Sequence, residues 1–193
     1  LAFGFHSDAG LTPNDSIVGT LSIYTRLSEN KSVFPDGEDR GINRPLTDIV
    51  QTQIVDDIRQ QWNPKWTRRE IWDKSYSESR TPMVPSMLLE LLSHQNFEDM
   101  KYGLDPAFRF TVSRAVYKGI LKFLSNRYGC PYVVQPLPVH GFAAEIKDKN
   151  TVHLSWKPTE DPLEPTAKAQ SYWLYTRVDN GAFDAGVPVD GNA

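Results

Sequence analysis

The stretch VPSMLLELL, residues 84–92, decides the fold of this chain, because it is apolar on both faces except for one carboxylate. A strand of this kind is typical of the centre of a sheet that helices cover on each side. Glu90 interrupts the apolar run, and an unpaired carboxylate that leaves water is costly. Glu90 is therefore expected to be protonated, paired or close to a metal ion. A structural Glu that meets an arginine or a helix N-terminus is an equally open reading.

Strands and amphipathic helices alternate around this central run. Residues 1–5 and 17–26 are rich in apolar, β-branched and aromatic side chains and predict two strands, and residues 69–77 predict a third. Residues 45–62 and 105–127 carry apolar side chains at three- and four-residue spacing, which predicts two helices. This order predicts an α/β fold, a three-layer α/β/α sandwich with a mixed sheet, of which the chain holds a part.

The ends of the second long helix are marked by residues that cap helices. Asp105 is expected at the N-cap with Pro106 at the first helical position, and Gly129 is expected to end the helix. Residues 96–102 predict a short helical turn before it, and residues 27–44 predict a polar loop.

The pattern of the chain changes at Cys130. From there, helical periodicity gives way to alternation in residues 152–156, to a strand-like stretch in residues 171–178, and to a hairpin signal at Asn180-Gly181. We therefore expect two domains, an α/β domain over residues 1–129 and a partial β-sandwich module over residues 130–193.

The bulk composition excludes some functions. Lys and Arg number 21 against 24 Asp and Glu, giving a net charge of −3 without a basic stripe, so a nucleic-acid partner is not expected. No apolar run approaches the ~20 residues that span a bilayer. One cysteine excludes an internal disulfide. The chain begins at Leu1 without Met or a basic segment, so we expect it to be part of a longer precursor.

Histidine and carboxylate side chains end two of the predicted strands. His6 follows the first apolar strand, and Glu90 lies near the end of the strand over 84–92. Because ligands bind at the carboxyl ends of strands in open α/β sheets, His6 and Glu90 could converge on one site. Imidazole is a common zinc ligand and a nearby Glu a common general base. A hydrogen-bonded structural role for His6 stays open, as does a simple turn-capping role for Asp8. His94 could line the same cleft or lie in a plain loop.

Two segments resemble the zinc-dependent N-acetylmuramoyl-L-alanine amidases. Residues 85–99, PSMLLELLSHQNFED, resemble the family's signature of a proline, an apolar strand with a Glu, a Phe-Leu-Ser-Asn stretch and an acidic residue. Residues 6–10, HSDAG, resemble the family's strand that ends in His. The resemblance covers residues 1–128 and includes the order of the helices.

The resemblance implies a fold, a cofactor and roles. It implies an α/β/α sandwich, a zinc ion, and cleavage of the amide between N-acetylmuramic acid and L-alanine in peptidoglycan. His6 takes the place of the last zinc ligand, and the remaining ligands lie upstream of this chain. Glu90 takes the place of the catalytic Glu, which removes a proton from water and gives one to the leaving amine. The cleft is expected to include Asp8, His94, Asn96 and Arg80.

The chain departs from the family in one segment, because SHQN at residues 93–96 stands where the family has Phe-Leu-Ser-Asn. The polar residues 27–44 are a further insertion that could reshape the cleft. Residues 131–193 resemble the first half of a fibronectin type III domain, with Trp156 as its core tryptophan. Together these resemblances imply a secreted, periplasmic or cell-surface bacterial protein.

Two other functions stay open. Some secreted bacterial proteins with this combination of modules are labelled xanthan lyases, and a lyase would need a cluster drawn from Tyr24, Tyr76, His94 and Arg80. The chain could also be a non-catalytic module that binds glycan or protein, which an exposed aromatic platform in the β-module would favour.

Overall fold

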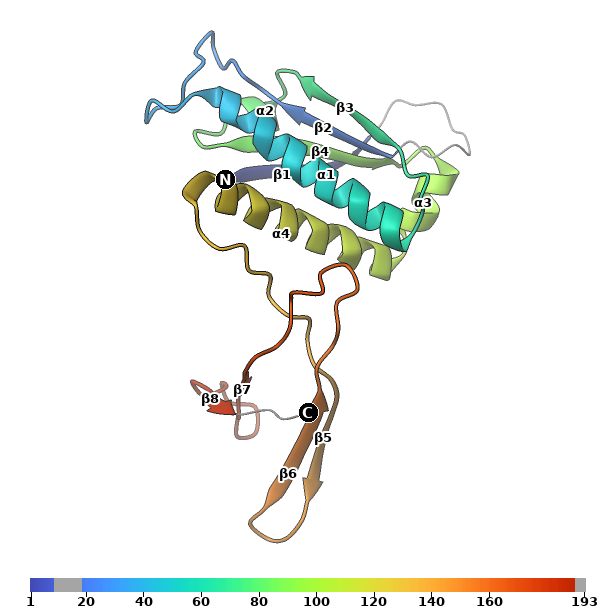
Figure 1. The fold of residues 1–193 in the computed structure, drawn as a ribbon, viewed down its shortest axis with the longest axis vertical. Coiled ribbons are helices and arrows are strands. Elements are labelled where there is room, and N and C mark those ends of the chain that lie inside the picture. Colours follow the sequence, from blue (N-terminus) through green and yellow to red (C-terminus); the bar gives the residue numbers. More distant parts are fainter. Residues whose placement is uncertain (9–18, 190–193) are drawn as a thin grey trace. The chain divides into compact units, whose positions relative to one another are not determined.

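A computed structural model describes residues 1–8 and 19–189 of the chain. The chain divides into two compact units, Leu1–Tyr132 and Val133–Ala193. The first is an α/β unit and the second consists of short strands and loops, as Figure 1 shows. The two units are described separately below.

A four-stranded mixed sheet forms the centre of the α/β unit. Its order is β1 (Ala2–Asp8), β4 (Ser86–Ser93), β2 (Thr20–Tyr24) and β3 (Arg68–Asp73). β4 runs parallel to β1 and antiparallel to β2, and β2 runs parallel to β3. The doubly apolar run around Glu90 therefore lies inside the sheet with a partner on each side, and both the predicted central strand and the mixed sheet are confirmed.

Two long helices cover one face of this sheet. α1 (Asn43–Gln61) and α4 (Pro106–Tyr128) run side by side across it (Figure 1). Three shorter helices complete the unit: η1 (Arg40–Ile42), α2 (Ser77–Arg80) and α3 (Phe97–Gly103). The predicted caps of α4 are confirmed, because the Asp105 side chain accepts the N–H of Ala107 and Gly129 adopts a left-handed φ of 64°.

The main apolar core lies between the sheet and the two long helices. Alternate residues of β4 point to this face, namely Met87, Leu89 and Leu91, and they pack against buried side chains of α1 and α4 such as Ile54 and Phe108. All five are at most 4% exposed. Burial of these side chains supplies the stabilising free energy of the unit.

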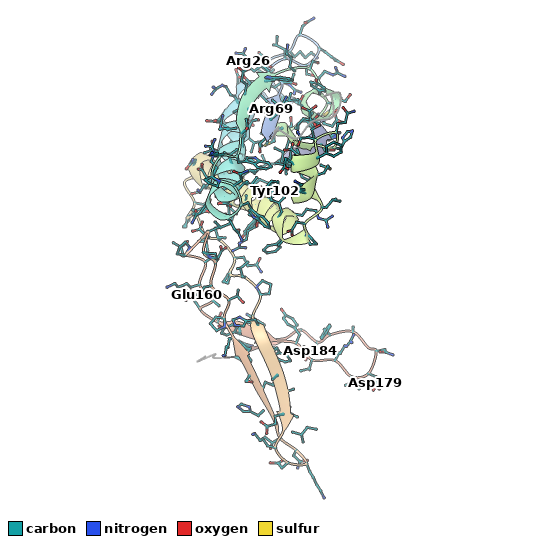
Figure 2. All side chains as sticks on the ribbon, turned by 90° about the vertical axis from the view of Figure 1, so that its right-hand side faces the viewer. Arg26, Arg69, Tyr102, Glu160, Asp179 and Asp184 are labelled. Atoms are coloured by element: carbon teal, nitrogen blue, oxygen red, sulfur yellow. The ribbon has the colours of Figure 1, made fainter. Side chains whose placement is uncertain are left out.

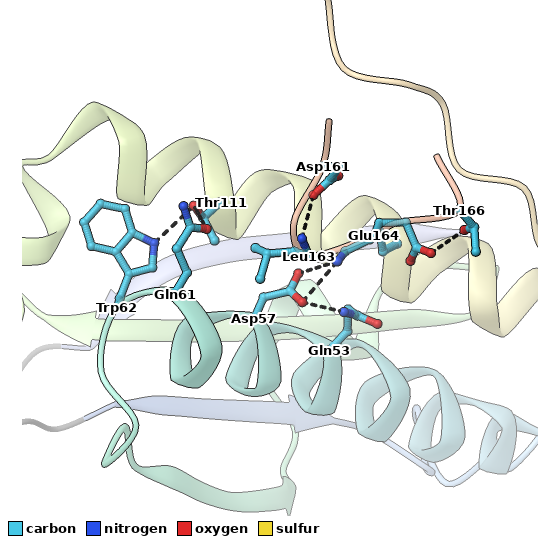
Figure 3. Close-up of polar contacts among 10 residues, drawn as sticks. Gln53, Asp57, Gln61, Trp62, Thr111, Asp161, Leu163, Glu164 and Thr166 are labelled. Atoms are coloured by element: carbon cyan, nitrogen blue, oxygen red, sulfur yellow. Dashed lines mark hydrogen bonds and ion pairs between the residues drawn. The ribbon is translucent and has the colours of Figure 1, made fainter. Parts of the chain in front are cut away.

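The α1–α4 interface also contains a buried ion pair. The Lys118 ammonium lies 3.0 Å from Oδ1 and 2.8 Å from Oδ2 of Asp57. Gln53 donates to Oδ1 of Asp57 at 2.8 Å. Nearby, the Trp62 indole N–H donates to Thr111 at 3.1 Å (Figure 3). These contacts join the two helices with polar groups as well as apolar ones.

The opposite face of the sheet carries a smaller apolar group. Leu21 and Ile23 of β2 and Leu88 of β4 are buried here and pack with Trp72 of β3. The short helix α2 packs on β4, β1 and β2. Because α2 occupies this side and the long helices the other, the unit has helices on both faces of its sheet.

Some predicted boundaries differ from the structure. The strand expected over 69–77 ends at Asp73, because the chain turns there into α2, which the sequence did not predict. α1 begins at Asn43, inside the expected loop, because the buried Asn43 side chain bonds the carbonyl of Thr25 and the N–H of Ser86. The strand expected over 17–26 spans Thr20–Tyr24 in the structure. Residues 17–18 of that expected strand, and residues 9–10 of the segment HSDAG, lie outside the described part of the chain.

The second unit contains two small antiparallel sheets. β5 (His140–Ile146) pairs with β6 (Val152–Lys157), and β7 (Tyr172–Leu174) pairs with β8 (Val187–Val189). The ring of Trp156 on β6 meets the ring of Tyr172 on β7 edge to face, with centroids 5.4 Å apart. The resemblance to a fibronectin type III domain stays a prediction for this unit.

Loop contacts in the second unit centre on Asp184, which is labelled in Figure 2. Its carboxylate accepts from Thr176 and from the N–H of Gly186, and these hydrogen bonds lower its pKa. The hairpin turn predicted at Asn180-Gly181 is shifted by one residue, because the N–H of Gly181 donates to the carbonyl of Val178 and the turn therefore has Asp179 and Asn180 at its centre. It lies inside a longer loop between β7 and β8, and the expected strand over 171–178 is shorter than predicted.

Among residues 1–8 and 19–189, the structure contains no helix that combines the length and the apolar character needed to cross a membrane.

Candidate functional site

The two residues on which the sequence reading depends lie next to each other in the sheet. His6 of β1 and Glu90 of β4 are direct register partners, and Leu21 of β2 lies opposite Glu90 on its other side. Register partners in a sheet point to the same face, so His6 and Glu90 share the face opposite to α1 and α4. The expected convergence of these two residues therefore results from strand pairing.

Glu90 has an unusual polar environment. Its Oε2 atom is buried and has no hydrogen-bond partner among the described residues. Burial raises the pKa of the Glu90 carboxyl above its ordinary value. The nearby His6 and Arg69 lower this pKa, whereas the negative charges of Asp8 and Glu78 raise it further. A carboxylate kept unpaired in this way is available to take up a proton or to meet a cation.

Asp8 lies at the same edge of the site and is held by an arginine. Its carboxylate is 2.6 Å from Nη1 of Arg69, a residue of β3 that Figure 2 labels. Both side chains are about one-fifth exposed, at 19% and 21%. Arg69 was not predicted as a site residue, because it is one of several charged residues in a half-exposed strand. The sequence does not indicate which arginine contacts Asp8, because β1 and β3 are far apart along the chain.

A second carboxylate that the sequence did not single out lies beside His6. Oε1 of Glu78 is 3.3 Å from Nε2 of His6, and the two side chains are 41% and 47% exposed. Glu78 belongs to α2, the short helix that begins at the last residue of the strand expected over 69–77. No local pattern could have found it, because the contact joins residues 72 positions apart in the sequence.

The other predicted cleft residues have mainly structural contacts. Nδ1 of His94 is 3.2 Å from Oγ of Ser7, where β1 and β4 end. Asn96 is fully buried and caps α3 by accepting the N–H of Asp99 at 2.8 Å. Arg80 ends α2, and its guanidinium donates to Ser75 at 3.1 Å.

Strand β4 is irregular just beyond Glu90, because its register with β1 shifts by one residue between the pairs His6–Glu90 and Asp8–Ser93. Leu92, inside this irregular part, has a φ of 67°, which is rare for a residue other than glycine and costs on the order of 1–3 kcal/mol. At the end of the strand, the N–H of Ser93 donates to the buried carboxylate of Asp99 at 2.8 Å. The acidic end of the stretch 85–99 thus fixes the end of the strand that carries Glu90.

A pocket of about 420 Å³ is lined by residues of β1, β4, α3 and α4. Its lining is mainly apolar and includes His6 together with Phe5, Leu92, Met100, Phe108 and Val112. Because Phe108 and Val112 belong to α4, this pocket lies on the face of the sheet opposite to that of Glu90, and His6 is one of its lining residues.

The donor types at this site suit zinc, which is bound by imidazole nitrogen and carboxylate oxygen. The buried, unpartnered Oε2 of Glu90 beside His6 fits a site that a cation or its bound ligand would occupy. Within residues 1–8 and 19–189, however, no three ligating side chains are grouped so that they could hold a metal ion. The zinc ion that the resemblance implies therefore stays a prediction.

Comparison with solved structures shows which fold this is. An N-acetylmuramoyl-L-alanine amidase from Clostridium difficile 630 superposes with a TM-score of 0.51 and 17% identity, over 65% of this chain and 57% of that one. An amidase of the same activity from Nostoc punctiforme gives 0.49 and 18%, over 64% and 57% of the two chains. No known protein-family profile and no curated protein matches the sequence.

The fold of the α/β unit follows from the first of these comparisons. The α/β unit has the fold of the N-acetylmuramoyl-L-alanine amidases, and the chain spans somewhat more than half the length of the amidase it matches. At 17% identity the likeness establishes the fold, and the activity is a separate question.

Proposed function

We propose that this chain is part of a zinc-dependent hydrolase that cleaves the amide between N-acetylmuramic acid and L-alanine in peptidoglycan. The observation that carries this proposal is the buried Oε2 atom of Glu90, which has no hydrogen-bond partner among the described residues and lies next to His6 in a unit with the amidase fold. The substrate implies that the protein acts outside the cytoplasmic membrane, in a secreted, periplasmic or surface-bound form.

Glu90 is suited to carry the proton in this reaction. A general acid–base group works best when its pKa is close to the working pH, and burial moves the pKa of Glu90 upward in that direction. Glu90 would accept the proton of the attacking water as the C–O bond forms. It would then deliver that proton to the amine of L-alanine as the C–N bond breaks, so that the carboxylate is regenerated.

His6 would serve as one zinc ligand, with the remaining ligands outside residues 1–8 and 19–189. When bound, zinc would polarise the scissile carbonyl and lower the cost of the negative charge that develops on its oxygen. Asp8 and Arg69 would hold the end of β1, and thereby the position of His6, through their ion pair.

The direct test is Glu90→Gln in the intact protein that contains this chain, assayed on purified peptidoglycan for newly exposed L-alanine amino groups. We expect a loss of about 10²-fold or more in rate, because general acid–base groups contribute about 10²–10⁴-fold. Glu70→Gln on β3 is the matched control, since Glu70 is an exposed carboxylate of the same sheet. Unchanged hydrolysis in Glu90→Gln would remove the assignment.

Zinc content separates this proposal from its alternatives. We expect about one zinc per chain in the intact protein and its loss in His6→Ala. A well-folded protein without zinc and without turnover would favour a binding module. Unsaturated sugar products that absorb ultraviolet light, without new amines, would favour a polysaccharide lyase.

A further inference from the structure

The short helix α2 is fixed to the sheet more firmly than its four residues would suggest. Ser79 is fully buried, and its hydroxyl lies 2.6 Å from that of Thr25. The Ser86 hydroxyl donates to the carbonyl of Ser79 at 3.1 Å, which ties α2 to the start of β4. The guanidinium of the buried Arg40 donates to the carbonyl of Arg80 at 3.3 Å. These contacts hold the backbone directly after Glu78.

A glycine on the neighbouring strand leaves room for Glu78. A Cβ atom on Gly4 would lie 3.1 Å from Cβ of Glu78 and 2.9 Å from a methyl group of Leu88. The first distance is shorter than ordinary van der Waals contact, so a side chain at position 4 would push α2 away from β1. Because Gly4 and His6 lie two residues apart on one strand, they face the same side, and Glu78 reaches His6 across Gly4.

The carboxylate of Glu78 meets one particular nitrogen of His6. Oε1 is 3.3 Å from Nε2, which is close to the usual hydrogen-bond range of up to about 3.2 Å and makes this nitrogen the one that faces the carboxylate. A histidine that binds a metal through one ring nitrogen commonly donates the N–H of the other to a carboxylate, which fixes both the tautomer and the ring orientation.

We propose that Glu78 is the positioning residue of His6: it accepts the Nε2–H of the imidazole and leaves the lone pair of Nδ1 free to bind a metal ion. The metal-binding part of this statement rests on the proposed function, whereas the pairing of Glu78 with His6 does not. Glu78 and Glu90 then have separate tasks, since one orients the imidazole and the other moves the proton.

The pairing can be tested on the 193-residue chain without metal by NMR of His6 in protein with ¹⁵N-labelled histidine. The ¹⁵N shifts of the two ring nitrogens, measured above the ordinary titration range of histidine, report the tautomer, and couplings about χ1 report the orientation of the ring. We expect a single Nε2–H tautomer and one χ1 rotamer in the wild type. Glu78→Ala should give a mixture of tautomers and an averaged χ1. Glu78→Gln should restore the wild-type pattern, because its amide oxygen can still accept the N–H.

Glu70→Ala is the control, because it removes an exposed carboxylate from the same sheet. A spectrum of Glu78→Ala that matches those of the wild type and Glu70→Ala would overturn the pairing. Thermal unfolding of each variant, compared with the NMR result, identifies a general loss of structure, which would broaden all four histidine signals rather than that of His6 alone.

The metal-binding part is tested by zinc competition with a chelator in the intact protein. We expect Glu78→Ala to weaken zinc binding about 10- to 100-fold and Glu78→Gln to weaken it less. Equal affinity in wild type and Glu78→Ala would overturn this part while leaving the amidase proposal in place. If the wild type binds no zinc, the proposed function fails, and the NMR experiment still decides whether Glu78 positions His6.

Discussion

Asp57 and Glu90 are two carboxylates inside the same α/β unit, on opposite faces of one sheet. Burial raises the pKa of both. Asp57, on the helical side, has the Lys118 ammonium within 3.0 Å of each oxygen and a hydrogen bond from Gln53. One buried oxygen of each carboxylate, Oδ2 of Asp57 and Oε2 of Glu90, has no hydrogen-bond partner among the described residues. Oδ2 of Asp57 is nevertheless 2.8 Å from the Lys118 ammonium, whereas Oε2 of Glu90 has no such close cation among the described residues.

This difference indicates that the helical face of the sheet contributes stability, whereas the opposite face could contribute a catalytic group. A buried charge that meets its counter-ion is satisfied in the ground state, and removal of one partner leaves the other unpaired in a medium where it cannot be solvated. A buried carboxylate without a partner lowers the stability of the folded state and keeps its oxygen free for a proton or a ligand. The comparison predicts opposite effects for similar substitutions at the two positions.

The largest effect is expected at the ion pair. Lys118→Met should lower the free energy of unfolding by about 3–5 kcal/mol, because Asp57 is then left charged between two helices. Asp57→Leu combined with Lys118→Met should recover a large part of that loss, since neither charge remains. Chemical denaturation of the single and double variants measures both. A single variant as stable as the wild type would contradict this account of the interface.

A smaller effect is expected where the same helices approach closely. A Cβ atom on Gly119 of α4 would lie 2.8 Å from the backbone Cα of Val50 on α1, and a backbone atom cannot move aside cheaply. Gly119→Ala should therefore cost about 1–3 kcal/mol, although alanine favours helices over glycine. Thermal unfolding provides the measurement. A higher unfolding temperature for Gly119→Ala would show that α1 and α4 can move apart without a loss of stability.

A still smaller effect is expected at Asn96, which the sequence reading placed in the cleft. In the structure its side chain caps α3, so Asn96→Ala should cost about 1 kcal/mol of stability, and Asn96→Asp should cost less because aspartate also caps helices. If hydrolysis is established, activity at a temperature well below unfolding distinguishes the roles. A rate loss in Asn96→Ala without a stability loss would favour the cleft reading.

The smallest change in stability is expected at Glu90. Glu90→Gln removes a partly buried charge whose Oε2 atom has no hydrogen-bond partner among the described residues, so the free energy of unfolding should stay the same or rise by up to about 2 kcal/mol, even as hydrolysis is lost. Denaturation of Glu90→Gln beside Lys118→Met makes the contrast between the two faces measurable. A loss of several kcal/mol in Glu90→Gln would mean that Glu90 is a structural carboxylate like Asp57.

The sequence by itself determined the elements that depend on local chemistry and periodicity. The central strand around Glu90, the two long helices and the caps Asp105 and Gly129 were predicted because apolar spacing and capping residues act over a few positions. The resemblance of residues 85–99 to the amidases pointed to the fold that the structural comparison shows. The roles of His6 and Glu90 stay predictions, although strand pairing places the two side by side.

Only the tertiary structure decided which distant charges meet. Arg69 reaches Asp8, Glu78 reaches His6 and Lys118 reaches Asp57, and each pair is separated by more than 60 residues in the sequence. Nothing local marks these partners among the many charged residues of an ordinary soluble composition. They are selected by strand order and by helix packing, because a charge finds its counter-ion only after the backbone has brought the two elements together.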